Sequence, residues 1–254
     1  MRPLVLLLGA AAGLAAFVDH GTAAPLSIGF LARPATPCAA PPVSCAQTAP
    51  GAGELAAYRG LHGAAAKGDV AAIVGLVSAG ADLDAPDGHG RTPLMVAAYK
   101  RHHEAARALI GAGADVNALD RDRYDLLTIA AVLDDVGMVG LAIASGADTA
   151  LVTSPYQGTA LIAAAHLGHV EVVDALIAAQ APLDHVNNLG WTALIEAIVL
   201  GDGGPRHAAI VGALVAAGAD VDLADGTGTR PLGLARQRGH GAIARILEGA
   251  GARP

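Results

Sequence analysis

Apolar and polar positions along this chain repeat about every 33 residues. In the clearest copy, from Asp87 to Val116, apolar residues lie at helical spacing over 94–98 and again over about 104–111. This pattern predicts two short helices per copy, the second with Ala105, Ala108, Leu109 and Ile110 facing inward. A leucine opens the first helix of each copy, at intervals of 33, 33, 34, 33 and 38 residues: Leu61, Leu94, Leu127, Leu161, Leu194 and Leu232. A period of this size predicts a solenoid of stacked units.

Residues at the ends of the expected helices have the chemistry of helix caps. The Thr92 hydroxyl can accept a hydrogen bond from an unpaired N–H of the first turn, and Asp125 can do the same in the next copy. Pro93 suits the first helical position. Gly113 is expected to end the second helix in a left-handed conformation. In the fourth copy Gln180 takes the place of this glycine, so we expect a changed local geometry there.

Two short motifs carry a resemblance to a known family. Thr92-Pro93-Leu94-Met95-Val96-Ala97, with Gly113-Ala114-Asp115 downstream, resembles the Thr-Pro-Leu-His-x-Ala signature and Gly-Ala-Asp hairpin of the ankyrin repeat. The resemblance covers about 200 residues in several copies. It implies an all-α ankyrin-repeat solenoid of helix-turn-helix units with β-turn fingers, and a protein that binds other proteins. The ankyrin-repeat domain is expected at 54–254, with repeats at 54–86, 87–119, 120–152, 153–186, 187–224 and 225–254.

The copies differ from one another at identifiable places. The first has Arg59-Gly60 where Thr-Pro is usual, which indicates a degenerate N-terminal cap. The fifth carries an insertion at 202–206, which is either a loop that contacts a partner or extra length tolerated at a turn. The sixth is rich in arginine, as expected for a C-terminal cap that faces water.

The segment before the repeats has a different character. Met1-Arg2, the apolar run 4–18 and the small residues 21–24 have the layout of a secretory signal peptide, residues 1–24. The alternative is an uncleaved anchor, but the run is shorter than the ~20 residues that span a bilayer. Residues 25–53 are rich in proline and alanine and are expected to form a flexible leader. Cys38 and Cys45 lie in this leader, and an even cysteine count in an exported protein favours a disulfide between them.

Composition and motifs argue against several classes of function. The net charge of −7 disfavours nonspecific nucleic-acid binding. No nucleophile elbow, phosphate-binding loop or His-Glu-x-x-His motif occurs in the sequence, so we expect no enzyme activity and no cofactor. Ten histidines invite a metal hypothesis. However, His62 and His169 stand at positions where the ankyrin family uses histidine structurally, with local hydrogen bonds expected for His169, so we expect no metal site.

Arginine and aromatic residues gather on one predicted surface, formed by the fingers and the first helix of each pair. These residue types dominate interface hot spots. The resemblance implies that partners bind there, and the matching positions are His89, Arg91, Tyr99, Lys100, Arg121, Arg123, Tyr124, Tyr156, His166, Asn188 and Trp191. For Tyr124 and Trp191, the alternative is that each covers the base of the hairpin or the neighbouring finger.

The sequence therefore indicates an exported, periplasmic or extracellular scaffold or adaptor that binds a partner protein noncovalently, with no nucleic acid and no membrane after signal cleavage. An inhibitor or immunity-type protein that blocks a specific enzyme would share the same architecture. A histidine-based metal carrier is a third hypothesis.

Overall fold

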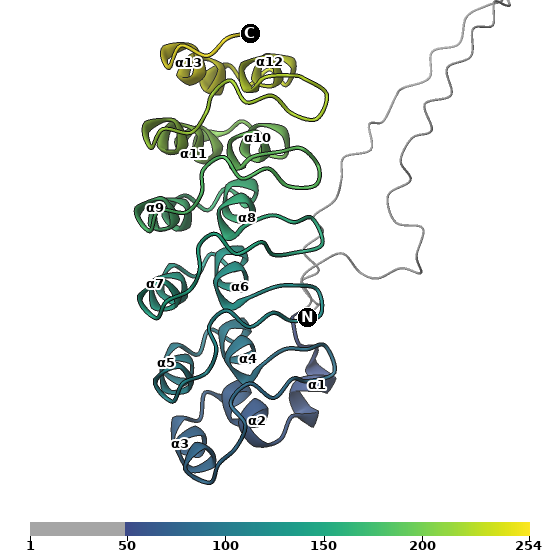
Figure 1. The fold of residues 1–254 in the computed structure, drawn as a ribbon, viewed down its shortest axis with the longest axis vertical. Helices are drawn as coiled ribbons and strands as arrows, with labels where there is room; N and C mark the ends of the chain where they lie inside the picture. Colours follow the sequence, from purple (N-terminus) through teal and green to yellow (C-terminus); the bar gives the residue numbers. More distant parts are fainter. Residues whose placement is uncertain (1–48) are drawn as a thin grey trace, which may run out of the picture.

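The chain forms a stack of helix pairs in the computed structural model, which describes residues 49–254. Inner and outer helices stand in two columns, and the fingers project from the side of the inner column (Figure 1). The inner helices are α2 (Gly60–Lys67), α4 (Pro93–Tyr99), α6 (Leu126–Val132), α8 (Ala160–Leu167), α10 (Ala193–Val199) and α12 (Pro231–Gln237). The outer helices are α3 (Val70–Ser78), α5 (His103–Gly111), α7 (Val136–Ala144), α9 (Val170–Ala178), α11 (Pro205–Ala216) and α13 (Gly241–Gly249). The predicted all-α solenoid is confirmed. The expected signal peptide, Cys38 and Cys45 lie outside the described residues.

The inner helices begin where side chains cap them. Thr92 Oγ1 accepts a hydrogen bond from the N–H of Met95 at 3.3 Å, and Asp125 Oδ1 accepts one from Thr128 at 2.8 Å. Both predicted caps are confirmed, as is the position of Pro93 in the first turn of α4. Such a cap contributes about 1 kcal/mol because it satisfies a donor that the helix itself leaves free.

The outer helix of the second repeat faces the core almost as the pattern predicts. Ala105 and Leu109 are buried, while Ala108 and Ile110 pack at the edge of the core. Ala106 has no exposed surface, so it belongs to the inward face although the pattern did not single it out.

The turns after the outer helices use positive φ angles. Gly113 has φ 103°, as predicted. Gln180 also remains left-handed, with φ 59°, so the expected change of geometry in the fourth repeat is wrong. The stacking of the repeats holds this residue in a conformation that costs an L side chain about 1 kcal/mol.

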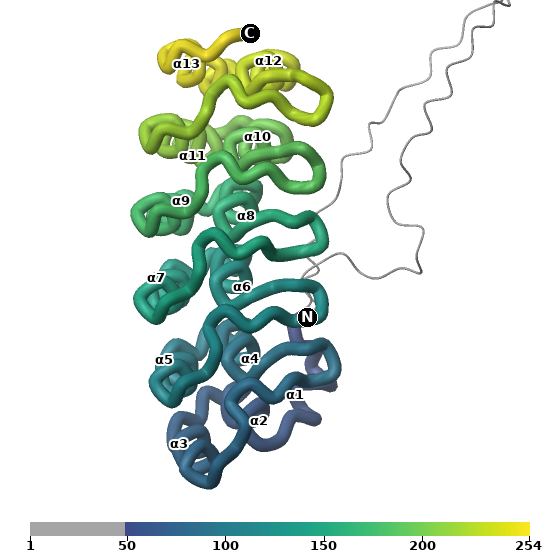
Figure 2. The backbone as a smooth tube through the Cα atoms, in the orientation of Figure 1, coloured from purple at the N-terminus to yellow at the C-terminus, as the bar shows by residue number. Residues whose placement is uncertain are grey.

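The fingers share one hydrogen-bonding scheme and stack on each other (Figure 2). In the second finger, Asp87 Oδ1 accepts from the N–H groups of His89 and Arg91, and Asp120, Asn187 and Asp225 repeat the arrangement. The fourth finger lacks this side chain. Its Thr153 N–H donates to the Gly158 carbonyl at 2.8 Å across one additional residue. Backbone hydrogen bonds join neighbouring fingers, including Asn188 N–H to the Tyr156 carbonyl at 3.0 Å.

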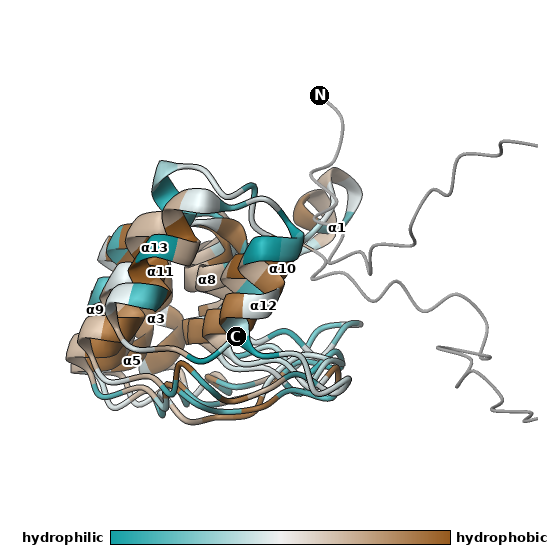
Figure 3. Ribbon diagram, turned by 90° about the horizontal axis from the view of Figure 1, so that it is seen from above, coloured by the Kyte–Doolittle hydropathy of each residue, from teal (hydrophilic) through white to brown (hydrophobic). Residues whose placement is uncertain are grey.

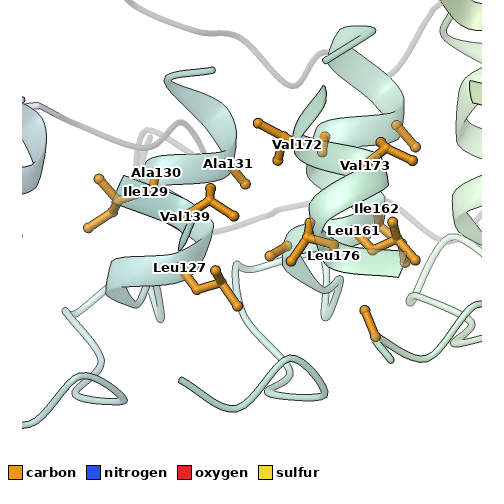
Figure 4. Packing of buried hydrophobic residues seen from close by; sticks show 14 of the residues in the cluster. Leu127, Ile129, Ala130, Ala131, Val139, Leu161, Ile162, Val172, Val173 and Leu176 are labelled. Carbon is orange, nitrogen blue, oxygen red and sulfur yellow. The ribbon is translucent and has the colours of Figure 1, made fainter. Parts of the chain in front are cut away.

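One continuous core runs between the two helix columns. Seen along the stack, apolar residues are concentrated in the two helix columns, and polar residues are frequent in the fingers (Figure 3). Leu127 and Ile129 of α6 lie near Val139 of α7, and Leu161 of α8 lies near Leu176 of α9 (Figure 4). Small alanines between these larger residues let the helices approach closely, so each repeat buries its apolar faces only against its neighbours.

A short additional helix, α1 (Ala52–Ala57), precedes the first repeat and lies outside the two columns. None of its residues is buried, and its Glu54 contacts the second finger through Arg91. Helical structure thus begins inside the span that the composition assigns to the leader. None of the helices in residues 49–254 is long and apolar enough to cross a membrane.

Candidate functional site

The eleven residues predicted to bind a partner do not all lie at the surface. Five are exposed: His89, Lys100, Arg121, Arg123 and Asn188. Four are partly buried: Tyr99, Tyr156, His166 and Trp191. Arg91 and Tyr124 are buried, with 0% and 1% of their surface exposed.

Arg91 forms an internal ion-pair cluster. Its Nε donates to Asp87 Oδ2 at 2.8 Å, and its Nη2 donates to Glu54 of α1. The Tyr58 hydroxyl donates to the same Asp87 oxygen at 2.5 Å. Burial by itself would raise the pKa of Asp87, but the hydrogen bonds from Tyr58 and Arg91 outweigh it and lower the pKa to about 2. Arg91 therefore ties α1 to the second finger and offers no surface to a partner.

Tyr124 covers the base of its finger, which is the alternative considered for it. Its neighbour Asp120 is almost fully buried and accepts two backbone N–H groups, from Asp122 and Tyr124. Burial raises the pKa of Asp120 to about 6, with a smaller contribution from the charge of Asp122. Asp87 and Asp120 occupy equivalent positions, and their pKa values shift in opposite directions because only Asp87 accepts side-chain hydrogen bonds, from Tyr58 and Arg91.

A hollow opens on the concave face between the third and fifth repeats. Its volume is about 40 Å³ and it is partly open to solvent, and it brings together four of the predicted residues, Tyr124, Tyr156, His166 and Trp191. Leu189 adds an exposed apolar side chain to the wall. The other predicted residues do not line this hollow.

Two local departures from the repeat pattern surround the hollow. Ala163, on its wall, stands four residues after the N-cap of α8, where α4, α6 and α12 carry Val96, Ile129 and Leu234. The fourth finger, with its additional residue, supplies Ser154 and Gly158 to the rim. A small side chain on α8 and a changed finger thus accompany the hollow, at a position where α4, α6 and α12 carry larger side chains and α2 carries Gly63.

A buried carboxylate lies on the wall of the hollow. Glu196 of α10 is 3% exposed, and its Oε2 lies 3.1 Å from His166 Nδ1. Its Oε1 accepts a hydrogen bond from Asn187 Nδ2 at 2.9 Å. Sequence reasoning missed Glu196 and Asn187. The available signal was the register of the repeats, since an acidic residue interrupts a position that is otherwise apolar.

The histidines mainly satisfy backbone carbonyls of neighbouring repeats. His169 Nδ1 lies 2.8 Å from the carbonyl of Ala131, and His62 Nε2 lies 2.9 Å from that of Arg91. The role of His169 is structural, as expected, but it bridges repeats instead of making a local bond. Within residues 49–254, no three histidine, cysteine or acidic side chains gather closely enough to hold a metal ion.

The insertion at 202–206 is tied to its own repeat. Asp202 Oδ1 lies 2.8 Å from Nδ1 of the buried His207, and it also accepts a hydrogen bond from the Gly204 N–H. His207 Nε2 in turn lies 3.1 Å from the carbonyl of His166. The last residues of the insertion, Pro205 and Arg206, form the start of α11. Through His207, the insertion is linked to His166 on the wall of the hollow.

Comparison with known proteins gives consistent results. The family model of ankyrin repeats in three copies matches residues 61–153 and 127–225. The ankyrin repeat protein YahD of Escherichia coli is 36% identical over 190 residues, which span 74% of this chain and 94% of that protein. The crystal structure of an ankyrin repeat domain from Acinetobacter baumannii superimposes with a TM-score of 0.73 at 46% identity, covering 76% of this chain and 98% of that domain.

A further solved structure that matches this chain is a complex of two different proteins. It holds a predatory endopeptidase from Bdellovibrio bacteriovorus in complex with an immunity protein. One chain of it matches with a TM-score of 0.64 at 25% identity, over 76% of this chain and 98% of that chain.

Proposed function

Because this chain belongs to the ankyrin-repeat family, we propose that it is an exported scaffold or adaptor that holds a partner protein on its concave face. Ankyrin repeats are protein–protein interaction modules, generally without enzyme activity of their own. The observation that carries the finer proposal is the hollow lined by Tyr156, His166, Leu189 and Trp191. Partly exposed aromatic residues around a concavity are typical of the anchoring points of protein interfaces.

The proposed surface extends along the fingers on either side of the hollow. His89, Arg121, Arg123 and Asn188 are exposed there, while Arg91 and Tyr124 support the fingers from inside. A polar, charged rim around an aromatic centre is the usual arrangement of a protein interface. Export is supported by the signal-like segment 1–24. Fractionation of cells that make the full chain tests export, since the exported protein would lack the mass of that segment.

A second candidate function is an inhibitor or immunity-type protein. The structural match to a chain in the endopeptidase–immunity protein complex favours it, because a chain of this fold takes part in a complex between an enzyme and an immunity protein. The two candidates differ in what the captured partner is. An inhibitor would bind an enzyme and abolish its activity at equimolar concentration, whereas a scaffold would leave the activity of its partner intact.

Affinity capture from an extract of the source cells tests the proposal. The bait is the full chain, and two variants accompany it: Tyr156→Ala with Trp191→Ala on the concave face, and Arg107→Ala on α5 of the outer column. Arg107 is 57% exposed and pairs only with Glu104 of its own helix. A partner retained by the wild type and the Arg107 variant but lost with the double variant supports the proposal. Equal retention by all three refutes the concave face as the binding surface.

A further inference from the structure

Glu196 differs in character from the residues at the equivalent position of the other repeats. Four residues after the N-cap, the inner helices α2, α4, α6, α8 and α12 carry Gly63, Val96, Ile129, Ala163 and Leu234, and α10 carries Glu196. The fold therefore accepts an apolar residue here. A buried carboxylate opposes stability unless its charge is matched, so its presence on the wall of a hollow points to a ligand.

The hydrogen bonds of Glu196 leave part of its acceptor capacity unused. Asn187 Nδ2 donates to one oxygen at 2.9 Å, and the His166 imidazole lies 3.1 Å from the other. A carboxylate offers about four acceptor sites. Throughout residues 49–254, the ion pairs of Glu196 involve His166 and no lysine or arginine. A cationic donor from a partner would use the remaining acceptor sites and add a permanent positive charge beside Glu196.

The rest of the hollow suits one kind of cation. Tyr156 and Trp191 line it together with Leu189 and Ile162, so most of its wall is apolar and aromatic. A guanidinium group is planar, weakly hydrated and attracted to aromatic rings, and it pairs with a carboxylate through two parallel N–H donors. The aliphatic stem of arginine would cover the apolar wall. The compact, strongly hydrated ammonium of lysine matches these features less well.

We propose that this hollow, lined by Tyr156, Ala163, Trp191 and Glu196, binds an arginine side chain that a partner protein inserts from the concave side. This inference rests on the proposed function and specifies the chemistry of the partner at one position. The partner then presents an exposed arginine at the centre of its own interface.

The single tryptophan of the chain reports directly on occupancy of the hollow. Trp191 is the only tryptophan, so its fluorescence can be followed in the full chain without labelling. The probes are N-acetyl-arginine amide, its neutral isostere N-acetyl-citrulline amide, and N-acetyl-leucine amide. For ligands of this size we expect dissociation constants of about 1–10 mM. Arginine amide is expected to bind about tenfold more tightly than citrulline amide because only the former carries a charge.

Three variants make the test specific. Glu196→Gln keeps the shape of the side chain and is expected to reduce arginine binding to the level of citrulline. Ala163→Ile introduces a side chain of the type that Ile129 provides at the equivalent position of α6, and it should abolish binding of all probes by filling the hollow. Ala163→Ser, which barely changes the volume, should bind as the wild type does. Circular dichroism must show equal helicity in all four proteins.

Three results overturn the proposal. The first is binding of leucine amide as tight as that of arginine amide. The second is an arginine preference that survives in Glu196→Gln. The third is no saturable fluorescence change with any probe up to about 50 mM. None of them refutes a concave binding face, which the capture experiment tests independently through Tyr156 and Trp191. Conversely, arginine binding without any captured partner would uphold the pocket and refute the scaffold.

Discussion

Nδ1 of His166 lies 3.1 Å from Oε2 of Glu196, and this contact joins the inner helices of the fourth and fifth repeats. The pair stands in the hollow between Tyr156 and Trp191, at positions that other repeats fill differently. The hollow is therefore formed by neighbouring repeats together and not by one repeat alone. A protein built of identical consensus repeats would keep the fold and lose the hollow.

Filling the hollow should raise stability while it removes binding. Ala163→Ile adds apolar surface at a partly buried position, so we expect the free energy of unfolding to rise by about 1 kcal/mol. The same variant should bind its partner more weakly, as is common where a functional surface is not optimised for stability. Urea denaturation and partner binding of the same protein sample test both effects. A loss of stability would mean that the space is already fully packed.

Arg91 should be important for stability and not for direct partner contact. Arg91→Met leaves Asp87 and Glu54 without their cation, and Asp87 is largely buried, so we expect a loss of about 2–4 kcal/mol in urea denaturation. Arg107→Met removes a pair that is exposed on both sides and screened by water, so its cost should be far smaller than that of Arg91→Met. Similar costs for the two variants would contradict the structural role of Arg91. Its removal should also expose α1 to proteolysis, because Glu54 loses its anchor.

Asp120 should make stability decrease as the pH rises. Its pKa is about 6 in the folded protein because of burial, and near 4 in the unfolded chain. Between these values the folded state binds more protons, so the free energy of unfolding falls from pH 4 to pH 6 through this group. Asp120→Asn keeps the acceptor for two N–H groups, as Asn187 does in the fifth finger.

The Asp120→Asn variant is therefore expected to be more stable than the wild type by about 1–3 kcal/mol at pH 7, with little difference near pH 3.5. Urea denaturation of both proteins at the two pH values measures this. A difference that does not depend on pH would show that Asp120 is not protonated more readily in the folded state.

Gln180 offers a local test of the turn geometry. Its φ of 59° suits glycine, which stands at this position in most other repeats, so Gln180→Gly should stabilise the protein by about 0.5–1 kcal/mol. Ala179→Gly is the matched control. Ala179 has φ −85°, and glycine there should lower stability through the greater freedom of the unfolded chain. Thermal denaturation of the two variants should show shifts of opposite sign.

The fold follows from the sequence because each repeat carries its own local signals. Thr92, Asp125 and Gly113 cap their helices as predicted, and the leucine register places the inner helices correctly. Gln180 shows where local reasoning fails. Its own preference argues against a left-handed turn, but packing of α9 against its neighbours determines the conformation.

The candidate site follows from the sequence only in part. Tyr156, His166 and Trp191 were predicted and do meet in the hollow. Arg91 was predicted as a surface residue because the finger position is usually exposed. Its burial depends on α1, whose Glu54 lies 37 residues away in the chain, and the repeat pattern contains no information on that helix. Glu196 was not predicted, although it is an acidic residue at a position of the repeat that is apolar in the other inner helices.

The most direct test of the concave binding face is the affinity of the captured partner for matched variants. Tyr156→Ala and Trp191→Ala should each raise its dissociation constant by about 30-fold, which corresponds to about 2 kcal/mol for an interface hot spot. Arg107→Ala on the outer column should change it less than about twofold. If Arg107→Ala weakens binding and both aromatic variants bind like the wild type, the partner binds the convex side and the concave face is not the functional surface.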